Sequence, residues 1–348
     1  MLDYLLAVVD GKPGVLAWLT RGVLRVLSWL YAFGLEVDLL TYPLGLARVT
    51  RLPARVVGVG NLSMGGTGKT LAVQRLVREA QAAGQRVAVL SRGYRRKSTD
   101  AVGVVATPEG ICLSARAAGD EPFLLASSLP GVPVLVGKNR RLTGWHAVEH
   151  FGTQLLVLDD SFQYWRLHKD HEIVLLDALQ PATRDHVLPR GFLREPWGHL
   201  RRAHEVWITH AELAPPSRVR ALAARVRRTA PHAALHFTEH KPLQLRAPDG
   251  ATAPLALLQD HPVLALSSLG NPSQFEAMLA GLGAVVTPCR YPDHHPYDDA
   301  DVAAIAAAVP AGALVVTTAK DAVRLPAAPP FPLWIVDVEL AEVAEPEG

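Results

Sequence analysis

The sequence has few cysteines, little net charge and no long uninterrupted apolar run. Cys112 and Cys289 are the only cysteines among 348 residues, and neither is flanked by metal-ligating residues at a recognised spacing. Their scarcity excludes a disulfide scaffold and is typical of a reducing compartment. The formal net charge is +2 at pH 7, and no run of lysines and arginines is interleaved with aromatic residues. We therefore expect no nucleic acid partner.

The longest apolar stretch, residues 15–40, is interrupted by Arg21 and Arg25. These arginines share one face of the expected helix. A membrane-spanning helix needs about 20 consecutive apolar residues and tolerates central arginines poorly. We therefore expect a helix that lies in the membrane interface, with Trp18 and Trp29 on its apolar surface and the arginines near lipid headgroups. The alternative is a helix that packs on the rest of its own chain.

The length of the chain exceeds what one hydrophobic core usually serves, so we expect two domains of unequal size. Short apolar runs alternate with helical segments from residue 55 onward, which predicts a mostly parallel sheet covered by helices. The expected strands are residues 55–60, 86–91, 155–159, 172–177, 205–209, 263–267, 284–288, 314–318 and 333–338. Helices are expected at residues 71–83, 273–282 and 299–308.

The predicted organisation of the chain has four parts. Residues 1–40 form the N-terminal helical segment, and residues 41–225 form the larger α/β domain. A polar stretch that contains prolines and arginines, residues 214–252, predicts the connection, which we assign to residues 226–255. Residues 256–348 form the smaller α/β domain.

A glycine-rich turn at residues 63–70 carries the strongest chemical signal, because it follows an expected strand and precedes an expected helix. Its core consists of Gly65, Gly66, Thr67, Gly68, Lys69 and Thr70. The glycines let backbone N–H groups approach phosphate oxygens, Lys69 places a positive charge at the terminal phosphates, and Thr70 is expected to bind Mg²⁺. Ser63 replaces the usual first glycine of this pattern. Partitioning-type ATPases have a second lysine where this chain has Met64, which disfavours a nucleotide switch of that class.

A second acidic centre, Asp159 and Asp160, ends the apolar run at residues 155–158. In phosphate-loop enzymes an aspartate at a strand end binds Mg²⁺ directly or through water. A helix cap is the simpler alternative. The glycine-rich turn favours the metal interpretation, so we expect ATP and Mg²⁺ as cofactors.

Together these motifs resemble the tetraacyldisaccharide 4′-kinase family, whose members phosphorylate the disaccharide precursor of lipid A at the inner membrane. The resemblance runs from about Val56 to Leu325. The matching segments are VGNL at 59–62, GGTGKT at 65–70, LSRGY at 90–94, GDEP at 119–122, LDD at 158–160, FQ at 162–163, LREP at 193–196, GNP at 270–272, YPDHH at 291–295, TT at 317–318 and KD at 320–321.

The resemblance implies an α/β fold with a parallel-sheet phosphate-loop domain, a second and smaller α/β domain, and an N-terminal membrane-associated helix. It implies transfer of a phosphoryl group from ATP to the 4′-hydroxyl of a glycolipid disaccharide 1-phosphate. We expect a monomer bound peripherally or monotopically to the cytoplasmic face of the inner membrane.

The resemblance also assigns catalytic roles. Asp120 acts as the general base on the sugar hydroxyl and His294 supports it. These two residues fall in different predicted domains, so we expect closure of a cleft to bring them together. Arg194 or Arg92 stabilises the transferring phosphoryl group, with a surface salt bridge as the alternative for either. The expected ligands of Mg²⁺ and its water shell are Thr70, Glu121, Asp159, Asp160, Gln163 and Glu195.

Two observations leave the assignment open at particular points. The adjacent residues Asp293, His294 and His295 have a competing interpretation as a transition-metal site. The chain also departs from the family pattern at Ser161, Tyr164 and Ala319, although none of these departures removes a residue that the implied mechanism uses. The alternatives are therefore a kinase of another glycolipid or sugar, or a nucleotide-switch ATPase.

Overall fold

The computed structural model describes residues 2–94 and 96–347 and divides into two compact units. Unit 1 contains Met1–Arg92, Leu135–Glu239 and Leu340–Gly348, and unit 2 contains Gly93–Val134 and His240–Glu339. This division differs from the predicted boundaries, because residues 93–134 belong with the C-terminal part of the chain. The predicted connection also differs, since residues 216–246 form a regular helix and a long strand that enters both units.

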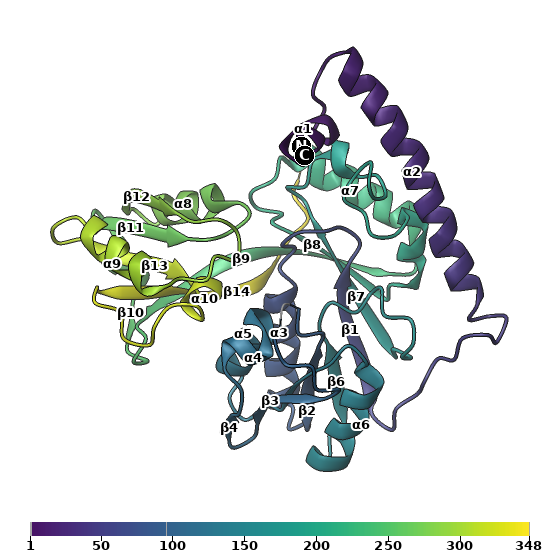
Figure 1. Cartoon of the computed structure of the whole chain (residues 1–348), viewed down its shortest axis with the longest axis horizontal. Coiled ribbons are helices and arrows are strands. Elements are labelled where there is room, and N and C mark those ends of the chain that lie inside the picture. The colour runs from purple at the N-terminus through teal and green to yellow at the C-terminus, as the bar shows by residue number, and fades with distance from the viewer. Residues whose placement is uncertain (1, 95, 348) are drawn as a thin grey trace. The chain divides into compact units, whose positions relative to one another are not determined.

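Unit 1 is built on a mostly parallel sheet with β1 near its centre (Figure 1). The strand order is β9 (Ala234–Arg246), β8 (Glu205–Thr209), β7 (His171–Asp177), β1 (Arg55–Asn61), β6 (Leu155–Leu158), β2 (Val87–Ser91) and β5 (Val134–Val136). All residues of β1 after Arg55 are buried, as expected for a parallel strand that is covered on both faces. Its neighbours β6 and β7 run parallel to it, with Val57 opposite Val157 and Val59 opposite Ile173.

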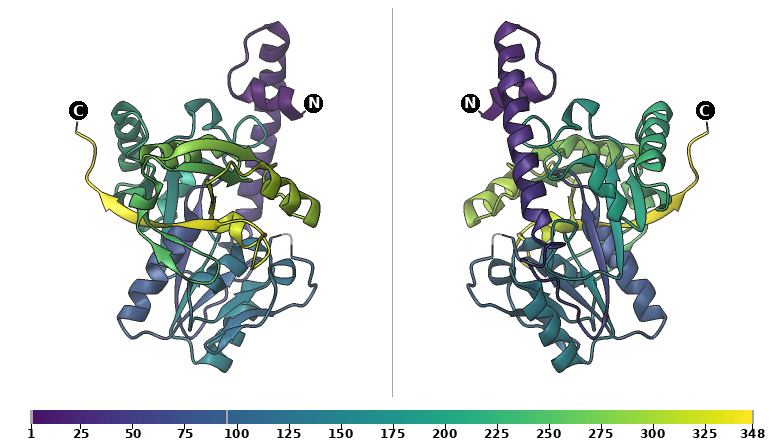
Figure 2. Two further views of the ribbon diagram at one scale, coloured as in Figure 1. Left: turned by 90° about the vertical axis from the view of Figure 1, so that its left-hand side faces the viewer. Right: turned by 90° about the vertical axis from the view of Figure 1, so that its right-hand side faces the viewer.

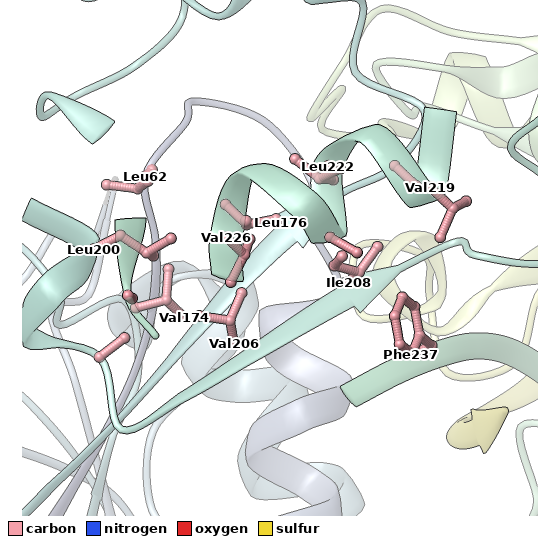
Figure 3. Close-up of a cluster of buried hydrophobic side chains, with 14 of the residues drawn as sticks. Leu62, Val174, Leu176, Leu200, Val206, Ile208, Val219, Leu222, Val226 and Phe237 are labelled. Carbon is pink, nitrogen blue, oxygen red and sulfur yellow. The ribbon is translucent and has the colours of Figure 1, made fainter. Parts of the chain in front are cut away.

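Helices cover this sheet and bury its apolar side chains. The long helices of the unit besides the N-terminal ones are α3 (Lys69–Ala82), α6 (Arg140–Phe151) and α7 (Pro216–Thr229), and short 3₁₀ helices occur at Ala182–Arg184 and Trp197–Arg202. In α7, Val219, Leu222 and Val226 recur at helical spacing and are buried. Figure 3 shows them facing side chains of β7 and β8 such as Val174 and Ile208.

A close approach of two chain segments requires glycine in β1. A Cβ atom on Gly60 would lie 2.6 Å from the backbone nitrogen of Phe162, which follows β6. We expect Gly60→Ala to destabilise unit 1 by about 1–3 kcal/mol, because neither buried backbone can yield freely. Urea denaturation followed by tryptophan fluorescence measures this loss. Gly22→Ala is the matched control, since a Cβ atom there would meet no described heavy atom within 4 Å beyond its chain neighbours and its own helix backbone. An equal effect of both substitutions would contradict the packing argument.

The N-terminal segment forms α1 (Leu2–Val9) and α2 (Val15–Leu40), and the bounds of α2 confirm the predicted helix. One face of α2 packs on unit 1 through buried residues that include Leu24 and Ser28. Its other side exposes large apolar side chains, with Trp18 68% and Phe33 69% exposed. Figure 2 shows the N-terminal end of α2 extending beyond the rest of unit 1. Among the described residues, no helix is both long and apolar enough to cross a membrane.

The two arginines of α2 differ in their surroundings. Arg21 donates hydrogen bonds to the backbone oxygens of Lys12 (2.7 Å) and Val8 (3.5 Å), so it joins α1 to α2. Arg25 is exposed and makes no hydrogen bond or ion pair with the described part of the chain. Of the two, Arg25 is therefore the one whose side chain is available to a headgroup.

Unit 2 contains a second parallel arrangement of strands, in the order β12 (Val285–Arg290), β11 (Pro262–Ser267), β13 (Leu314–Thr318) and β14 (Leu333–Val343). Alternate residues of β11 serve two separate cores. Val263 packs with side chains of α8 (Pro272–Gly281), and Leu264 packs with side chains of α9 (Asp299–Ala308). The remaining elements are β3 (Gly103–Thr107), β4 (Gly110–Ile111), α4 (Ala115–Ala118), α5 (Asp120–Ser128), β10 (Thr252–Ala253), a 3₁₀ helix at Leu255–Leu258 and α10 (Ala319–Ala322).

Candidate active site

The phosphate loop joins the end of β1 to the start of α3 in unit 1. Gly65 and Gly68 have φ angles of 112° and 82°, in the region that favours glycine. Gly68 is the N-terminal cap of α3 and, as a glycine, has no side chain that could cap this helix end, and the N-terminal end of a helix favours a bound anion. Asn61 Nδ2 donates a hydrogen bond to Thr67 Oγ1 (3.1 Å) and holds the base of the loop.

Two consecutive aspartates follow β6 and have different surroundings. Asp159 is buried, and its Oδ2 accepts a hydrogen bond from Ser91 Oγ (3.0 Å). Asp160 has a φ of 49°, a conformation that non-glycine residues adopt rarely and often at functional sites.

The carboxylate of Asp160 lies between two cations. Arg194 Nη1 is 2.9 Å from Asp160 Oδ1 and 3.0 Å from Oδ2, and Lys69 Nζ is 3.6 Å from Oδ1. Burial alone would raise the pKa of Asp160, but Lys69 and Arg194 outweigh that effect and hold the pKa below its ordinary value. The strand end thus presents an ionised carboxylate whose partners are the phosphate-loop lysine and an arginine.

Gln163 connects this cluster to the phosphate loop. Its Nε2 donates to the backbone oxygen of Asn61 (3.1 Å), and its Oε1 accepts from Arg194 Nη1 (3.3 Å). Thr70 is buried in the first turn of α3. The structure therefore brings Lys69, Thr70, Asp160, Gln163 and Arg194 to one end of the unit 1 sheet.

Glu195 follows Arg194 in the chain, but its side chain contacts Arg202 and His199 rather than Asp160. It is fully buried, and its Oε2 is 2.9 Å from Arg202 Nη2 and 2.8 Å from His199 Nδ1. His199 also contacts Glu36 of α2 (2.8 Å). The other oxygen of Glu195, Oε1, is buried without a hydrogen-bond partner, so this is the atom that remains for a water or an ion.

The proposed general base and its partner both lie in unit 2. Asp120 is the first residue of α5, and its Oδ2 is 3.5 Å from His294 Nδ1 and 3.5 Å from Arg324 Nε. His294, like Asp160, has a positive φ, of 60°. We expected these residues in different domains. The pair is instead formed within one unit, because residues 93–134 pack with the C-terminal segment, and no closure is needed to assemble it.

Arg324 is held on its other side by a buried carboxylate. Asp321 is fully buried and lies 3.2 Å from Arg324 Nη2, and Ser268 Oγ accepts a hydrogen bond from Arg324 Nη1 (2.7 Å). Glu121 follows Asp120 in the first turn of α5, also in unit 2. A transition-metal site at the histidine pair is not favoured, since His295 pairs with Asp301 (2.7 Å) rather than with the partner of His294. The described residues contain no cluster of three potential metal ligands.

Sequence reasoning missed Arg140 at this site. Arg140 is buried, and its Nη2 donates to the backbone oxygens of both Asp159 and Asp160 (3.2 Å each). Its guanidinium lies over the ring of Tyr164 at 4.8 Å. The backbone of the aspartate pair is therefore fixed by an arginine at the start of α6, where the local sequence reads as an ordinary polar helix start.

A pocket of about 400 Å³ lies beside these residues in unit 1. Its charged lining residues are Arg92, Lys138, Arg140, Asp160, Arg166 and Arg194. We call it the cationic pocket. It shares Asp160 and Arg194 with the cluster described above.

Comparisons with known proteins agree with the motifs. A family model described as tetraacyldisaccharide-1-P 4′-kinase matches residues 20–347. The tetraacyldisaccharide 4′-kinase of Anaeromyxobacter dehalogenans (strain 2CP-C) is 44% identical over 290 residues, which cover 82% of this chain and 76% of that protein. The enzyme of the same name from Syntrophus aciditrophicus (strain SB) is 39% identical over 313 residues, 87% of this chain and 84% of that protein.

A solved structure gives the same result for the fold. The crystal structure of LpxK from Aquifex aeolicus in complex with ATP matches with a TM-score of 0.75 and 29% sequence identity, and covers 94% of this chain and 96% of that one. The expected α/β fold and the expected family are thereby confirmed. With a family model that spans nearly the whole chain and relatives this similar, the chain belongs to the tetraacyldisaccharide 4′-kinase family.

Proposed function

We propose that this chain binds ATP with Mg²⁺ at its phosphate loop and transfers the γ-phosphoryl group to the 4′-hydroxyl of a tetraacyldisaccharide 1-phosphate, at the cytoplasmic face of the inner membrane. The observation that carries the proposal is the ionised Asp160 between Lys69 and Arg194. A carboxylate at a strand end, beside the phosphate-loop lysine, is the arrangement that phosphoryl-transfer sites use.

The site residues of unit 1 have distinct roles in the proposed reaction. Lys69 interacts with the β- and γ-phosphates, and the N–H groups of the loop and of α3 bind phosphate oxygens. Arg194 stabilises charge on the transferring group, since its guanidinium already reaches the neighbouring carboxylate.

The oxygen-rich donor set fits Mg²⁺, which prefers octahedral oxygen ligands and usually takes one or two carboxylates together with substrate phosphates. Thr70, Asp159 and Asp160 supply hydroxyl and carboxylate oxygens, and Asn61 Oδ1 is buried nearby without a hydrogen-bond partner. When bound, the ion neutralises charge on the nucleotide phosphates.

The acceptor hydroxyl must lose its proton as its oxygen attacks the γ-phosphorus and the bond to the β-phosphate oxygen breaks. We assign the proton to the carboxylate of Asp120, with His294 and Arg324 holding that carboxylate in place. ADP leaves with the displaced oxygen, and the product carries the new phosphate at position 4′.

An acceptor assay tests the proposed function. The purified chain, ATP labelled at the γ-phosphate and tetraacyldisaccharide 1-phosphate in detergent micelles are expected to yield a labelled lipid, and mass analysis is expected to place the new phosphate at the 4′ position. An acceptor without the 4′-hydroxyl serves as the control. ATP hydrolysis with no labelled lipid would instead support the nucleotide-switch alternative.

The exposed side of α2 supports attachment to the membrane surface. We expect replacement of Trp18, Trp29 and Phe33 by serine to lower the fraction of protein that co-sediments with anionic vesicles by at least about tenfold, because each aromatic side chain loses its burial in the interface. These substitutions leave the contacts of Ser28 and Tyr31 with unit 1 intact. Val285→Ser, at an apolar side chain that is 60% exposed in unit 2, is the control. Unchanged vesicle binding of the triple variant would mean that α2 is a structural helix.

A further inference from the structure

The cationic pocket carries more positive charge than its own chain neutralises. Five cationic side chains and one carboxylate line it. Asp160 is already paired with Arg194 and Lys69, and Arg140 is engaged with two backbone oxygens. The pocket therefore has a surplus of cations.

The surplus resides in Arg92, Lys138 and Arg166. The side chains of these three make no hydrogen bond or ion pair with any residue that the structure describes, and all three are exposed at the pocket. They come from three separate segments: the end of β2, the start of α6 and the stretch after β6. Cations from separate segments that converge without a partner repel one another, so their convergence favours a bound anion.

The N-terminal end of α6 also favours a bound anion in the cationic pocket. Lys138 and Asn139 immediately precede the 12-residue helix Arg140–Phe151 and line the pocket. The N-terminal end of a helix carries a partial positive charge. Burial lowers the pKa of Arg140 more than Asp159 and Asp160 raise it, and the like charge of Arg92 also lowers it.

The pocket is distinct from the part of unit 1 that holds the nucleotide in the proposed function. No residue of the phosphate loop, 63–70, lines it, and it meets the transfer site through Asp160, Gln163 and Arg194. The acceptor named by the family model is a disaccharide 1-phosphate, so its reacting hydroxyl and its phosphate lie on different sugars. A phosphate monoester carries a charge of about −1.5 to −2 at pH 7, which suits three unpaired cations.

We propose that Arg92, Lys138 and Arg166 bind the 1-phosphate group of the acceptor and so select a disaccharide that is already phosphorylated at position 1. This proposal rests on the proposed function. The acceptor must therefore already carry the 1-phosphate before the reaction catalysed by this chain.

The test compares two acceptors with variants of the pocket. Initial rates are measured for wild type, Lys138→Ala, Arg166→Ala and the double variant with tetraacyldisaccharide 1-phosphate and with the same disaccharide lacking the phosphate, in micelles of constant composition. With the phosphorylated acceptor, we expect each single variant to lose roughly 10- to 100-fold in kcat/KM, the scale of a lost charged hydrogen bond. With the unphosphorylated acceptor, we expect the variants to match wild type within about twofold, and the KM for ATP to remain unchanged.

Two controls separate recognition from general charge effects. Arg166→Lys keeps the charge and is expected to retain most of the preference for the phosphorylated acceptor. Arg78→Ala removes an exposed arginine of α3 outside the pocket, whose side chain has no partner in the part of the chain that the structure describes, and is expected to act like wild type with both acceptors. Thermal unfolding checks that every variant is folded.

Each contrary result has its own meaning. Equal losses with both acceptors, an equal loss in Arg78→Ala, or a rise in the KM for ATP that parallels the loss would overturn the assignment of the pocket to the 1-phosphate while leaving the proposed function in place. Failure of wild type to phosphorylate either acceptor would overturn the proposed function and, with it, this proposal.

Discussion

Asp120→Asn is expected to lower the rate of phosphoryl transfer by about 10²- to 10⁴-fold, the usual consequence of removing a general base. Asparagine keeps the shape of the side chain, so α5 and its contacts with His294 and Arg324 should persist. Binding of ATP should remain close to normal, because the phosphate loop and Lys69 belong to unit 1 and are unaffected. Single-turnover rates and nucleotide titrations measure the two effects separately.

The neighbouring histidine provides the companion measurement. His294→Ala should reduce the rate less than Asp120→Asn, and the double variant should be little worse than Asp120→Asn alone, since residues that act as one unit are strongly non-additive. The 3.5 Å separation of the two side chains supports such a unit. Additive losses, or a collapse of ATP affinity in Asp120→Asn, would contradict the assigned roles.

Lys69→Ala should reduce transfer by more than about 100-fold, because the positive charge at the β- and γ-phosphates disappears. The fold should survive, since Asp160 keeps its bidentate contact with Arg194 and no buried charge is left unpaired. Arg78→Ala is the matched control on the same helix: it removes an exposed cation of α3, away from the loop. Comparable turnover of Lys69→Ala and wild type would refute the phosphate-loop assignment.

The sequence predicted the strands of both units because they are short apolar runs, and most of them are buried on both faces, although β12 is largely exposed. Every expected strand coincides with an observed one. Two elements that were not predicted, β9 and α7, have less regular patterns of apolar residues. The strand β9 contains histidine, lysine and proline and was interpreted as linker, whereas α7 has arginines on its exposed face that obscure the spacing of Val219, Leu222 and Val226.

Residues of the candidate site could be predicted from the sequence where they come directly after a predicted strand. The phosphate loop and Asp159-Asp160 follow the expected strands β1 and β6, so their proximity was accessible from the sequence. The contact of Asp120 with His294 was implied only by the family resemblance, because it depends on packing between segments 174 positions apart (294 minus 120) that no local pattern indicates. Arg140 was missed for a related reason: nothing local indicates that its guanidinium is buried against the backbone of the aspartate pair.

The order in which the chain leaves the ribosome sets a limit on how either unit can fold. Unit 1 is completed by Leu340–Gly348, and unit 2 is completed by His240–Glu339. In the last segment Glu342 contacts His236 (2.8 Å) and Arg75 (3.5 Å), which belong to β9 and α3. Contacts between such distant segments form late. Neither unit can therefore reach its final state during synthesis until nearly the whole chain is available. Removal of the residues after position 339 would disturb unit 1, which contains the phosphate loop, rather than unit 2, which contains the segment immediately before them.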